Sequence, residues 1–256
     1  MWKTNAKGLC DLSEKRCDSM GDKMKESNYK KLVYNTAIFA IGNFGSKVLT
    51  FLIVPLYTYV LTTAEYGVID LFITSLGMVI PFSTMMVNEA LIRYVLGKEL
   101  TPKEAASNCF AVFLFGAAVS VLFTPLYKVA FDFDEYIWIF VALLVLRTFN
   151  QVFSEYFRAV NQNVKFTIFG LITTATILGF NVVFLLFLKL GIRGYLYATL
   201  LSAAVGTLYI LIFSDFFQVV SLKCIDKNTI RMLLKYSVPL IPNSLMWWIM
   251  SAGDKY

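Results

Sequence analysis

The sequence predicts an all-α polytopic membrane protein with six complete transmembrane helices and the start of a seventh. Six long apolar stretches alternate with short polar connectors, and hydrophobic residues make up 58% of the 256-residue chain while 16% are charged. An apolar helix of about 20 residues crosses the hydrocarbon layer of a bilayer. Because lipid offers no hydrogen-bond partner to backbone N–H and C=O groups, such stretches must be helical.

The apolar stretches divide the chain into four parts. The six spans are predicted at residues 33–60, 66–96, 105–126, 136–160, 164–189 and 193–214, with a seventh beginning near residue 235. The parts are a polar cytoplasmic tail at 1–30, a six-helix membrane lobe at 31–214, a cytoplasmic connector at 215–234 and the start of a seventh helix at 235–256. The tail lacks the apolar core of a signal peptide, and Met24 offers an alternative start just before the first span. Since residues 247–256 carry no stop signal, we expect a truncated chain.

Basic residues lie mostly in alternate connectors, which predicts the orientation. Of the 23 Lys and Arg residues, 17 lie in the N-terminal segment and the even-numbered connectors, against three in the odd-numbered connectors. Lys and Arg accumulate in cytoplasmic loops, so the N-terminus is predicted to lie in the cytoplasm. This topology accounts for the net charge of +6. A nucleic-acid-binding face would be more continuous, and we expect no nucleic-acid partner.

The reactive residues of the sequence do not form a catalytic or metal site. The chain has four Cys and no His, and Cys10 and Cys17 lack the spacing of metal ligands. The absence of His also removes the usual general base of a hydrolase. No paired mid-span carboxylates or nucleophile motif appear. We therefore expect a protein that is not an enzyme and that has no catalytic residue, cofactor or metal.

Polar residues of the first span share one helix face. Asn43 and Lys47 are four residues apart, and Lys47 falls near the middle of the span. An ammonium at this depth costs about 3 kcal/mol on insertion scales, so it is expected to face a hydrated cavity or a partner. The alternative is a lysine that reaches the interface or pairs locally without function. In the second span Pro81 lies at the centre, where it frees a carbonyl group and permits a kink.

A longer polar stripe follows the fourth span. Its members lie at helical spacing on one face, whereas the other faces are apolar and aromatic. They are Arg147, Asn150, Gln151, Ser154, Arg158 and Asn161. Such a stripe is typical of a helix that lines an aqueous pathway. The alternative is interhelical hydrogen bonding within a packed bundle.

Together, Lys47 and Arg147 predict an anionic ligand. Both lie near mid-membrane, and no acidic residue at the same depth balances them. A guanidinium is well suited to phosphate oxygens. A sodium or proton site would need a mid-membrane carboxylate, which the six spans lack. The predicted substrate-binding residues are Lys47, Arg147, Asn43, Asn150, Gln151 and Ser154.

Several segments resemble a known family. They are "FLIVPLYTYVLTTAEYG" at 51–67, "ALIRYV" at 90–95, "YFRAVNQ" at 156–162, "LGIRGYLYATLLS" at 190–202 and "LKYSVPLIPNSLMWWIMSAGDKY" at 234–256. Their order and spacing are similar to those of bacterial oligosaccharide flippases, a branch of the multidrug/oligosaccharidyl-lipid/polysaccharide exporter superfamily. The resemblance covers nearly everything after residue 30. Lys47 and Arg147 are assigned from depth and periodicity, not from a family motif.

The resemblance implies a two-lobed flippase of 12 or 14 helices, of which this chain is the first lobe plus the start of the second. Such flippases move undecaprenyl-diphosphate-linked oligosaccharide to the outer leaflet of the bacterial cell membrane. The implied partners are this lipid-linked oligosaccharide and membrane lipid, with polysaccharide polymerase and glycosyltransferases as further candidates. Because alternating access needs two bodies around a shared site, one lobe alone is expected not to transport.

Two alternatives stay open. A cation-coupled multidrug exporter of the same superfamily shares the fold, and Asp254 is its candidate carboxylate. A non-transporting membrane fragment is the other, although the polar stripe of the fourth span argues against it.

Overall fold

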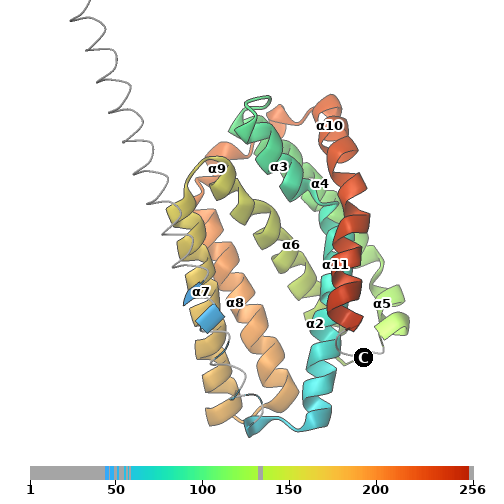
Figure 1. Ribbon diagram of the computed structural model, residues 1–256, viewed down its shortest axis with the longest axis vertical. Coiled ribbons are helices and arrows are strands. Elements are labelled where there is room, and N and C mark those ends of the chain that lie inside the picture. Colours follow the sequence, from blue (N-terminus) through green and yellow to red (C-terminus); the bar gives the residue numbers. More distant parts are fainter. Residues whose placement is uncertain are drawn as a thin grey trace, which may run out of the picture. The chain divides into compact units, whose positions relative to one another are not determined.

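The structure, a computed structural model, confirms the all-α class. It describes residues 44, 45, 47, 48, 51, 55, 57, 59–131 and 135–253, which all belong to one compact unit, Gly42–Tyr256. Every regular element within the described residues is a helix, and Figure 1 shows the helices packed side by side as a bundle. The predicted tail at 1–30 and Asn43 lie outside the described residues.

Five helices of the described part are long and apolar enough to cross a membrane. They are α2 (Thr63–Thr84), α4 (Pro102–Leu122), α6 (Ile137–Ala159), α7 (Asn163–Asn181) with its π-helical continuation η1 (Val182–Phe187), and α8 (Gly191–Phe213). These correspond to the second through sixth predicted spans. The described residues between 44 and 60 are helical, but most of the first predicted span, and with it the count of six, lies outside the described residues.

The prediction of one unbroken helix over 66–96 is wrong. Helix α2 ends at Thr84 and a separate helix, α3 (Val87–Leu96), begins two residues after Met85. Met85 and Met86 both have left-handed backbones, with φ of 48° and 55°. The break therefore follows Pro81, which lies inside α2, rather than occurring at it.

The close approach of α4 explains where the chain breaks. A Cβ on Gly116 would lie 1.9 Å from the backbone carbonyl oxygen of Ser83, so only a glycine lets the two helices meet there. One turn further along α4, the hydroxyls of Ser83 and Ser120 are hydrogen-bonded at 2.6 Å. The hydroxyl of Thr84 accepts the N–H of Met86 at 3.1 Å, which satisfies one of the backbone groups that the break exposes.

Capping residues fix the start of α4. Thr101 precedes Pro102 and accepts the backbone N–H of Glu104, whose carboxylate in turn accepts the N–H of Thr101. This reciprocal arrangement is a capping box, and Pro at the first helical position is favourable because it has no N–H to satisfy. After α4 the chain turns into α5 (Thr124–Phe131).

A helical region leads into the predicted seventh span and begins before residue 235. It consists of α10 (Lys227–Ser237), the 3-10 turn η3 (Val238–Leu240) and α11 (Ile241–Gly253). The connector before it contains α9 (Phe216–Val219) and a 3-10 turn, η2 (Leu222–Cys224). In Figure 1, α11 lies alongside α2.

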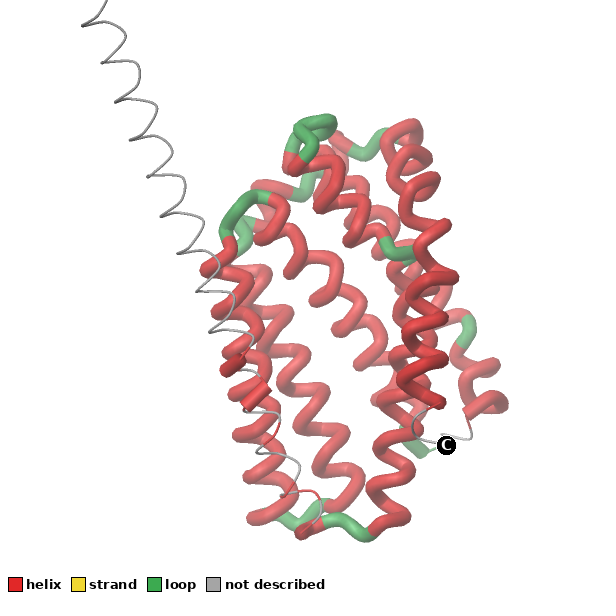
Figure 2. The backbone as a smooth tube through the Cα atoms, viewed as in Figure 1, coloured by secondary structure: helices red, strands yellow, loops and turns green. Residues whose placement is uncertain are grey.

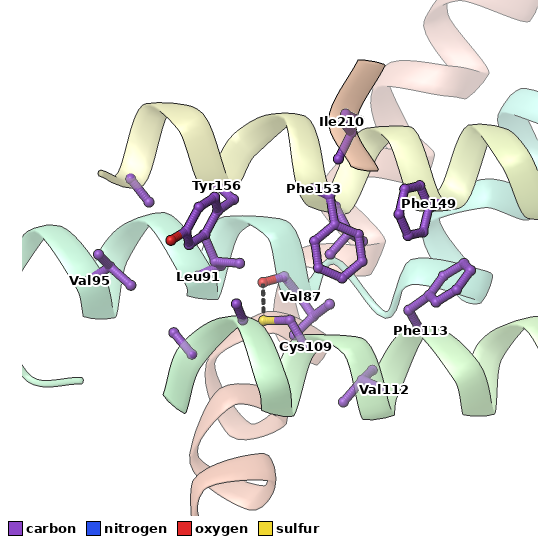
Figure 3. Packing of buried hydrophobic residues seen from close by; sticks show 14 of the residues in the cluster. Val87, Leu91, Val95, Cys109, Val112, Phe113, Phe149, Phe153, Tyr156 and Ile210 are labelled. Atoms are coloured by element: carbon purple, nitrogen blue, oxygen red, sulfur yellow. Dashed lines mark hydrogen bonds between the residues drawn. The ribbon is translucent and has the colours of Figure 1, made fainter. Parts of the chain in front are cut away.

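The interior is apolar and strongly aromatic. Figure 3 shows the larger cluster of buried residues, where α3, α4, α6 and α8 meet. Phe113, Phe149 and Phe153 stack edge to face or tilted with centroids 4.7 to 6.4 Å apart, and the thiol of Cys109 points to the carbonyl of Val87. A second cluster joins α2, α6 and α8 through residues such as Phe72 and Phe140.

The basic connectors gather at one end of the bundle. Lys165, after α6, donates to the carbonyl of Phe213 at the end of α8 (2.9 Å), and Asn108 of α4 donates to the carbonyl of Cys224 (3.1 Å). At the opposite end, Arg193 forms an ion pair with Glu135. Figure 2 shows these connecting loops at the two ends of the helices. This arrangement agrees with the alternating charge pattern, and the direction of insertion stays a prediction.

Candidate functional site

Arg147 lies midway along α6, about 15 Å from its N-terminal end. A membrane-spanning helix of this length places its midpoint near the centre of the hydrocarbon layer, as the sequence predicted. The side chain is partly buried. Within the part of the chain that the structure describes, it has no ion-pair partner and no hydrogen bond.

A polar cavity of about 280 Å³ opens beside this guanidinium, between α6, α7 and α8. Most of its lining side chains are hydroxyls or amides. The lining consists of Arg147 and Asn150 of α6, Phe169, Thr173, Thr174 and Ile177 of α7, and Thr199, Ser202 and Ala203 of α8. Among these described lining residues Arg147 alone is charged.

The hydroxyls of the cavity already donate their protons to helix backbone. Thr174 donates to Gly170 (2.7 Å) and Thr199 to Tyr195 (2.9 Å), each four residues back. Ser202 of α8 donates across to the carbonyl of Thr173 in α7 (2.8 Å). Of these bonds, the one from Ser202 to Thr173 joins two walls of the cavity, α8 and α7. The guanidinium of Arg147 has no such partner among the described residues, and its charge would favour an anion over a cation.

Asn150 combines a place on the cavity wall with a structural role. Its amide nitrogen donates to the carbonyl of Ala203 (2.8 Å), and its amide oxygen accepts the hydroxyl of Thr207 (3.0 Å). Both partners belong to α8, so the side chain joins α6 to α8. This is the interhelical hydrogen bonding that the sequence analysis kept as the alternative for the polar stripe.

The rest of the stripe does not reach the cavity. Gln151 is partly buried and Ser154 is buried, and neither lines the cavity. Further along α6, Arg158 pairs with Glu155 at 2.7 Å and lies over the ring of Phe166. The structure thus brings Arg147 and Asn150 together at the site and places the other stripe residues elsewhere.

The first-span cation lies apart from the cavity. Lys47 is exposed and is not among the lining residues. Its neighbour Gly45 lies against α7, where an added Cβ would be 3.2 Å from Leu171. The part of this span that the structure describes therefore packs on α7, and the structure does not bring Lys47 to Arg147. Asn43 lies outside the described residues.

Four polar lining residues were not predicted: Thr173, Thr174, Thr199 and Ser202. Hydroxyl residues are common in membrane helices because they can bond to the preceding turn, so their presence alone is a weak signal. The usable signal was their position, since Thr173 and Thr174 fall in the middle of α7 and Thr199 near the middle of α8. No group of three or more potential metal ligands occurs among the described residues.

The sequence matches the family described as "polysaccharide biosynthesis protein" over residues 32–256. The chain belongs to this family. A comparison with curated proteins finds no match. This family membership and the bundle of apolar helices make the chain a multi-pass membrane protein of the polysaccharide biosynthesis family.

Solved transporters share the fold. An outward-facing multidrug resistance MATE family transporter of the MOP superfamily matches with a TM-score of 0.60 and 14% identity, over 82% of this chain and 50% of that one. A MATE protein in complex with Br-NRF matches with a TM-score of 0.64 and 18% identity, over 83% and 56%. A MOP superfamily transporter from Pyrococcus furiosus matches with a TM-score of 0.56 and 15% identity, over 82% and 50%. The chain spans about half the length of these transporters.

Proposed function

We propose that the protein moves undecaprenyl-diphosphate-linked oligosaccharide from the cytoplasmic to the outer leaflet of the bacterial cell membrane, for cell-surface polysaccharide synthesis. The polysaccharide biosynthesis family and the transporter fold support an exporter that acts in this process. In this proposal the N-terminus is cytoplasmic, as the basic connectors predict. Polysaccharide polymerase and glycosyltransferases are the proposed protein partners.

The guanidinium of Arg147, which has no partner among the described residues, is the observation that supports a diphosphate-linked substrate. A cation that is partly buried at mid-membrane, with no counter-ion among the described residues, is costly, so we expect it to be retained where a ligand uses it. The cavity lies beside this cation, and a diphosphate supplies pairs of oxygens that a guanidinium binds with two parallel hydrogen bonds. A cationic drug would instead be repelled by the same group.

The size of the cavity limits what it holds. Drug-sized ligands occupy pockets of about 300 to 1,000 Å³, and this cavity of about 280 Å³ is smaller. It accommodates a diphosphate group but not an oligosaccharide as well. The sugars and the polyprenyl chain must therefore lie outside it. The proposed role of this lobe is to bind the charged headgroup, with Asn150 fixing α6 against α8 so that Arg147 keeps its place.

Lys47 enters the proposal as a separate cation. Since it is exposed, it does not share the headgroup cavity, and any role lies at another stage of transport. Gln151 and Ser154 are proposed to support the packing of α6 rather than to touch the substrate, because neither lines the cavity.

A transport assay tests the proposal. Because one lobe alone is not expected to transport, the protein expressed from its complete gene is used. It is reconstituted in liposomes with a fluorescent lipid-diphosphate oligosaccharide, and a membrane-impermeant reagent reports how much of this lipid reaches the outer leaflet. We expect protein-dependent movement of this lipid, and no movement of a cationic dye in parallel liposomes. Movement of the dye without movement of the lipid would overturn the proposal and favour the multidrug exporter.

A further inference from the structure

Helix α10 has two chemically different faces. Leu233 is fully buried in the larger core cluster, and Tyr236 packs against the same cluster beneath the guanidinium of Arg93, which lies 4.5 Å from its ring centroid. The opposite face carries Lys227, Arg231 and Lys235, all exposed. These three cations are spaced four residues apart, so they form one row along about 12 Å of helix.

The cations of this row have no counter-ion among the residues that the structure describes. No acidic residue occurs between Lys227 and Ser237, and none of the three cations forms an ion pair or hydrogen bond with the residues that the structure describes. The first cation of the row does not serve the stability of the helix, whereas Lys235 lies in the last turn, where a cation is favourable. Lys227 is the first residue of α10, where the positive end of the helix dipole makes a cation unfavourable.

A groove of about 770 Å³ runs along the same face. The three cations line it together with apolar side chains, among them Ile230, Leu234 and Val238. Cations and apolar side chains alternate along the groove from Lys227 onward, and its far end is formed by the exposed, apolar Val238 and Pro239. A groove that combines three cations with apolar side chains and ends on an apolar turn matches an amphiphile.

The surroundings of the groove identify its occupant. Through η3 the apolar end leads into α11, which lies alongside the membrane-spanning α2 (Figure 1) and is bonded to it through Trp248 and Thr74. The apolar end is therefore at the level where the bundle meets the hydrocarbon. The end at Lys227 belongs to the end of the bundle that holds the basic connectors. This is the depth profile of a phospholipid headgroup and the upper part of its acyl chains.

We propose that α10 is a binding site for an anionic phospholipid of the surrounding leaflet, whose phosphate binds Lys227, Arg231 and Lys235 and whose acyl chain packs on Ile230, Leu234 and Val238. The apolar side chains of the groove favour a lipid over a soluble phosphate. Electrostatic attraction of this kind is screened over about 8 Å at physiological ionic strength, so binding weakens as salt increases. The proposal does not depend on the transported substrate.

The test measures lipid adducts on the purified full chain by native mass spectrometry, after delipidation and incubation with equimolar phosphatidylglycerol and phosphatidylethanolamine. The wild-type chain is expected to retain phosphatidylglycerol. Each basic residue near an anionic surface contributes a factor of about five. The triple variant Lys227→Gln, Arg231→Gln, Lys235→Gln is therefore expected to bind it about 100-fold more weakly.

The matched control removes the same charge from the same end of the bundle. It is Lys98→Gln, Lys103→Gln, Lys223→Gln, three exposed residues outside the groove, and it is expected to keep the wild-type preference. Equal losses in both triple variants would overturn the site, since net charge alone would then explain binding. Displacement of the lipid by millimolar inorganic phosphate would overturn the choice of a lipid as occupant. If the triple variant does not fold, the single variant Arg231→Gln is compared with Lys103→Gln, and an unchanged affinity contradicts the proposal.

Discussion

The indole N–H of Trp248 in α11 donates a hydrogen bond to the backbone carbonyl of Thr74 in α2, with Nε1 and O 2.8 Å apart. Gly77 lies nearly one turn further along α2, and a Cβ there would meet Cδ1 of Trp248 at 3.4 Å. The Nε1–Cδ1 edge of the indole thus lies against a part of α2 that has no side chain to hold it away. This contact fixes the predicted seventh span against the second.

Removing this hydrogen bond should loosen α11. Trp248→Phe keeps an aromatic ring but loses the donor, so the free energy of unfolding is expected to fall by about 1 kcal/mol. Thermal unfolding in detergent measures the change. Trp247→Phe is the control, because Trp247 is 66% exposed and should have little effect. Equal shifts in the two variants would contradict the role of the hydrogen bond.

Gly116 and Gly179 give a matched test of the contact between α2 and α4. A Cβ on Gly116 meets the Ser83 backbone, whereas a Cβ on Gly179 meets nothing within 4 Å. Gly116→Ala must push two helices apart and is expected to cost about 3 kcal/mol, or to prevent folding. Gly179→Ala should be neutral or stabilising, since alanine favours helix. Folded yield and thermal midpoint measure both, and a stable Gly116→Ala would mean that α2 does not approach α4 so closely.

Asp226 makes the start of α10 sensitive to pH. Its carboxylate accepts the backbone N–H and the hydroxyl of Thr229 at 2.9 and 3.0 Å. These bonds favour the charged form and lower the pKa of Asp226 below its ordinary value. A lowered pKa stabilises the folded state above the ordinary value near 4, and this contribution is lost as the pH falls through the lowered pKa.

Asp226→Asn should remove this pH dependence while keeping a capping side chain, because Asn also caps helices well. The thermal midpoint of the wild-type chain is expected to fall more than that of the variant between about pH 5 and about pH 2.5. Parallel curves for the two proteins would show that the Asp226 cap contributes nothing to the acid sensitivity.

The helical spans could be predicted from the sequence because each depends on a local property. Apolar length located α4, α6, α7 and α8 to within a few residues. The break at Met85–Met86 could not be predicted, since it depends on the contact between Gly116 and Ser83, which are far apart in the sequence. Pro81 was the local signal for a kink, yet membrane helices tolerate proline when neighbouring groups satisfy the freed carbonyl.

The candidate site was predictable only where it depends on local properties of one helix. The depth of Arg147 follows from its position in an apolar stretch, and its place on the polar face follows from helical periodicity. The partners of Asn150, however, are Ala203 and Thr207 of another helix, which periodicity within α6 does not show. Whether a polar side chain faces a cavity or a neighbouring helix is decided by packing.

Cysteine accessibility tests the orientation. The native cysteines at 10, 17, 109 and 224 are first replaced by serine, and single cysteines are then introduced. A membrane-impermeant thiol reagent added outside the cell should label a cysteine at Thr63 and miss one at Lys98 or Lys227, which belong to the basic end of the bundle. The reverse labelling pattern would contradict the cytoplasmic N-terminus.

The central claim is that Arg147 binds the diphosphate of the substrate. Loss of hydrogen bonds to a charged group typically costs about 1.5 to 3 kcal/mol, which corresponds to a factor of about 10 to 100 in affinity. Arg147→Gln is therefore expected to weaken binding of undecaprenyl diphosphate by that factor. The affinity of Arg147→Lys for undecaprenyl diphosphate should lie between those of the wild type and Arg147→Gln, because a lysine keeps the charge but not the bidentate fork.

The most direct measurement is the dissociation constant of undecaprenyl diphosphate for the purified wild-type chain, for Arg147→Gln and for Arg158→Gln. Arg158 lies on the same helix and carries the same charge, but it pairs with Glu155 and does not line the cavity. We expect Arg147→Gln to bind at least about tenfold more weakly, and Arg158→Gln to bind as the wild type does. Wild-type affinity in Arg147→Gln, or equal weakening in both variants, would contradict the assignment of the diphosphate to Arg147.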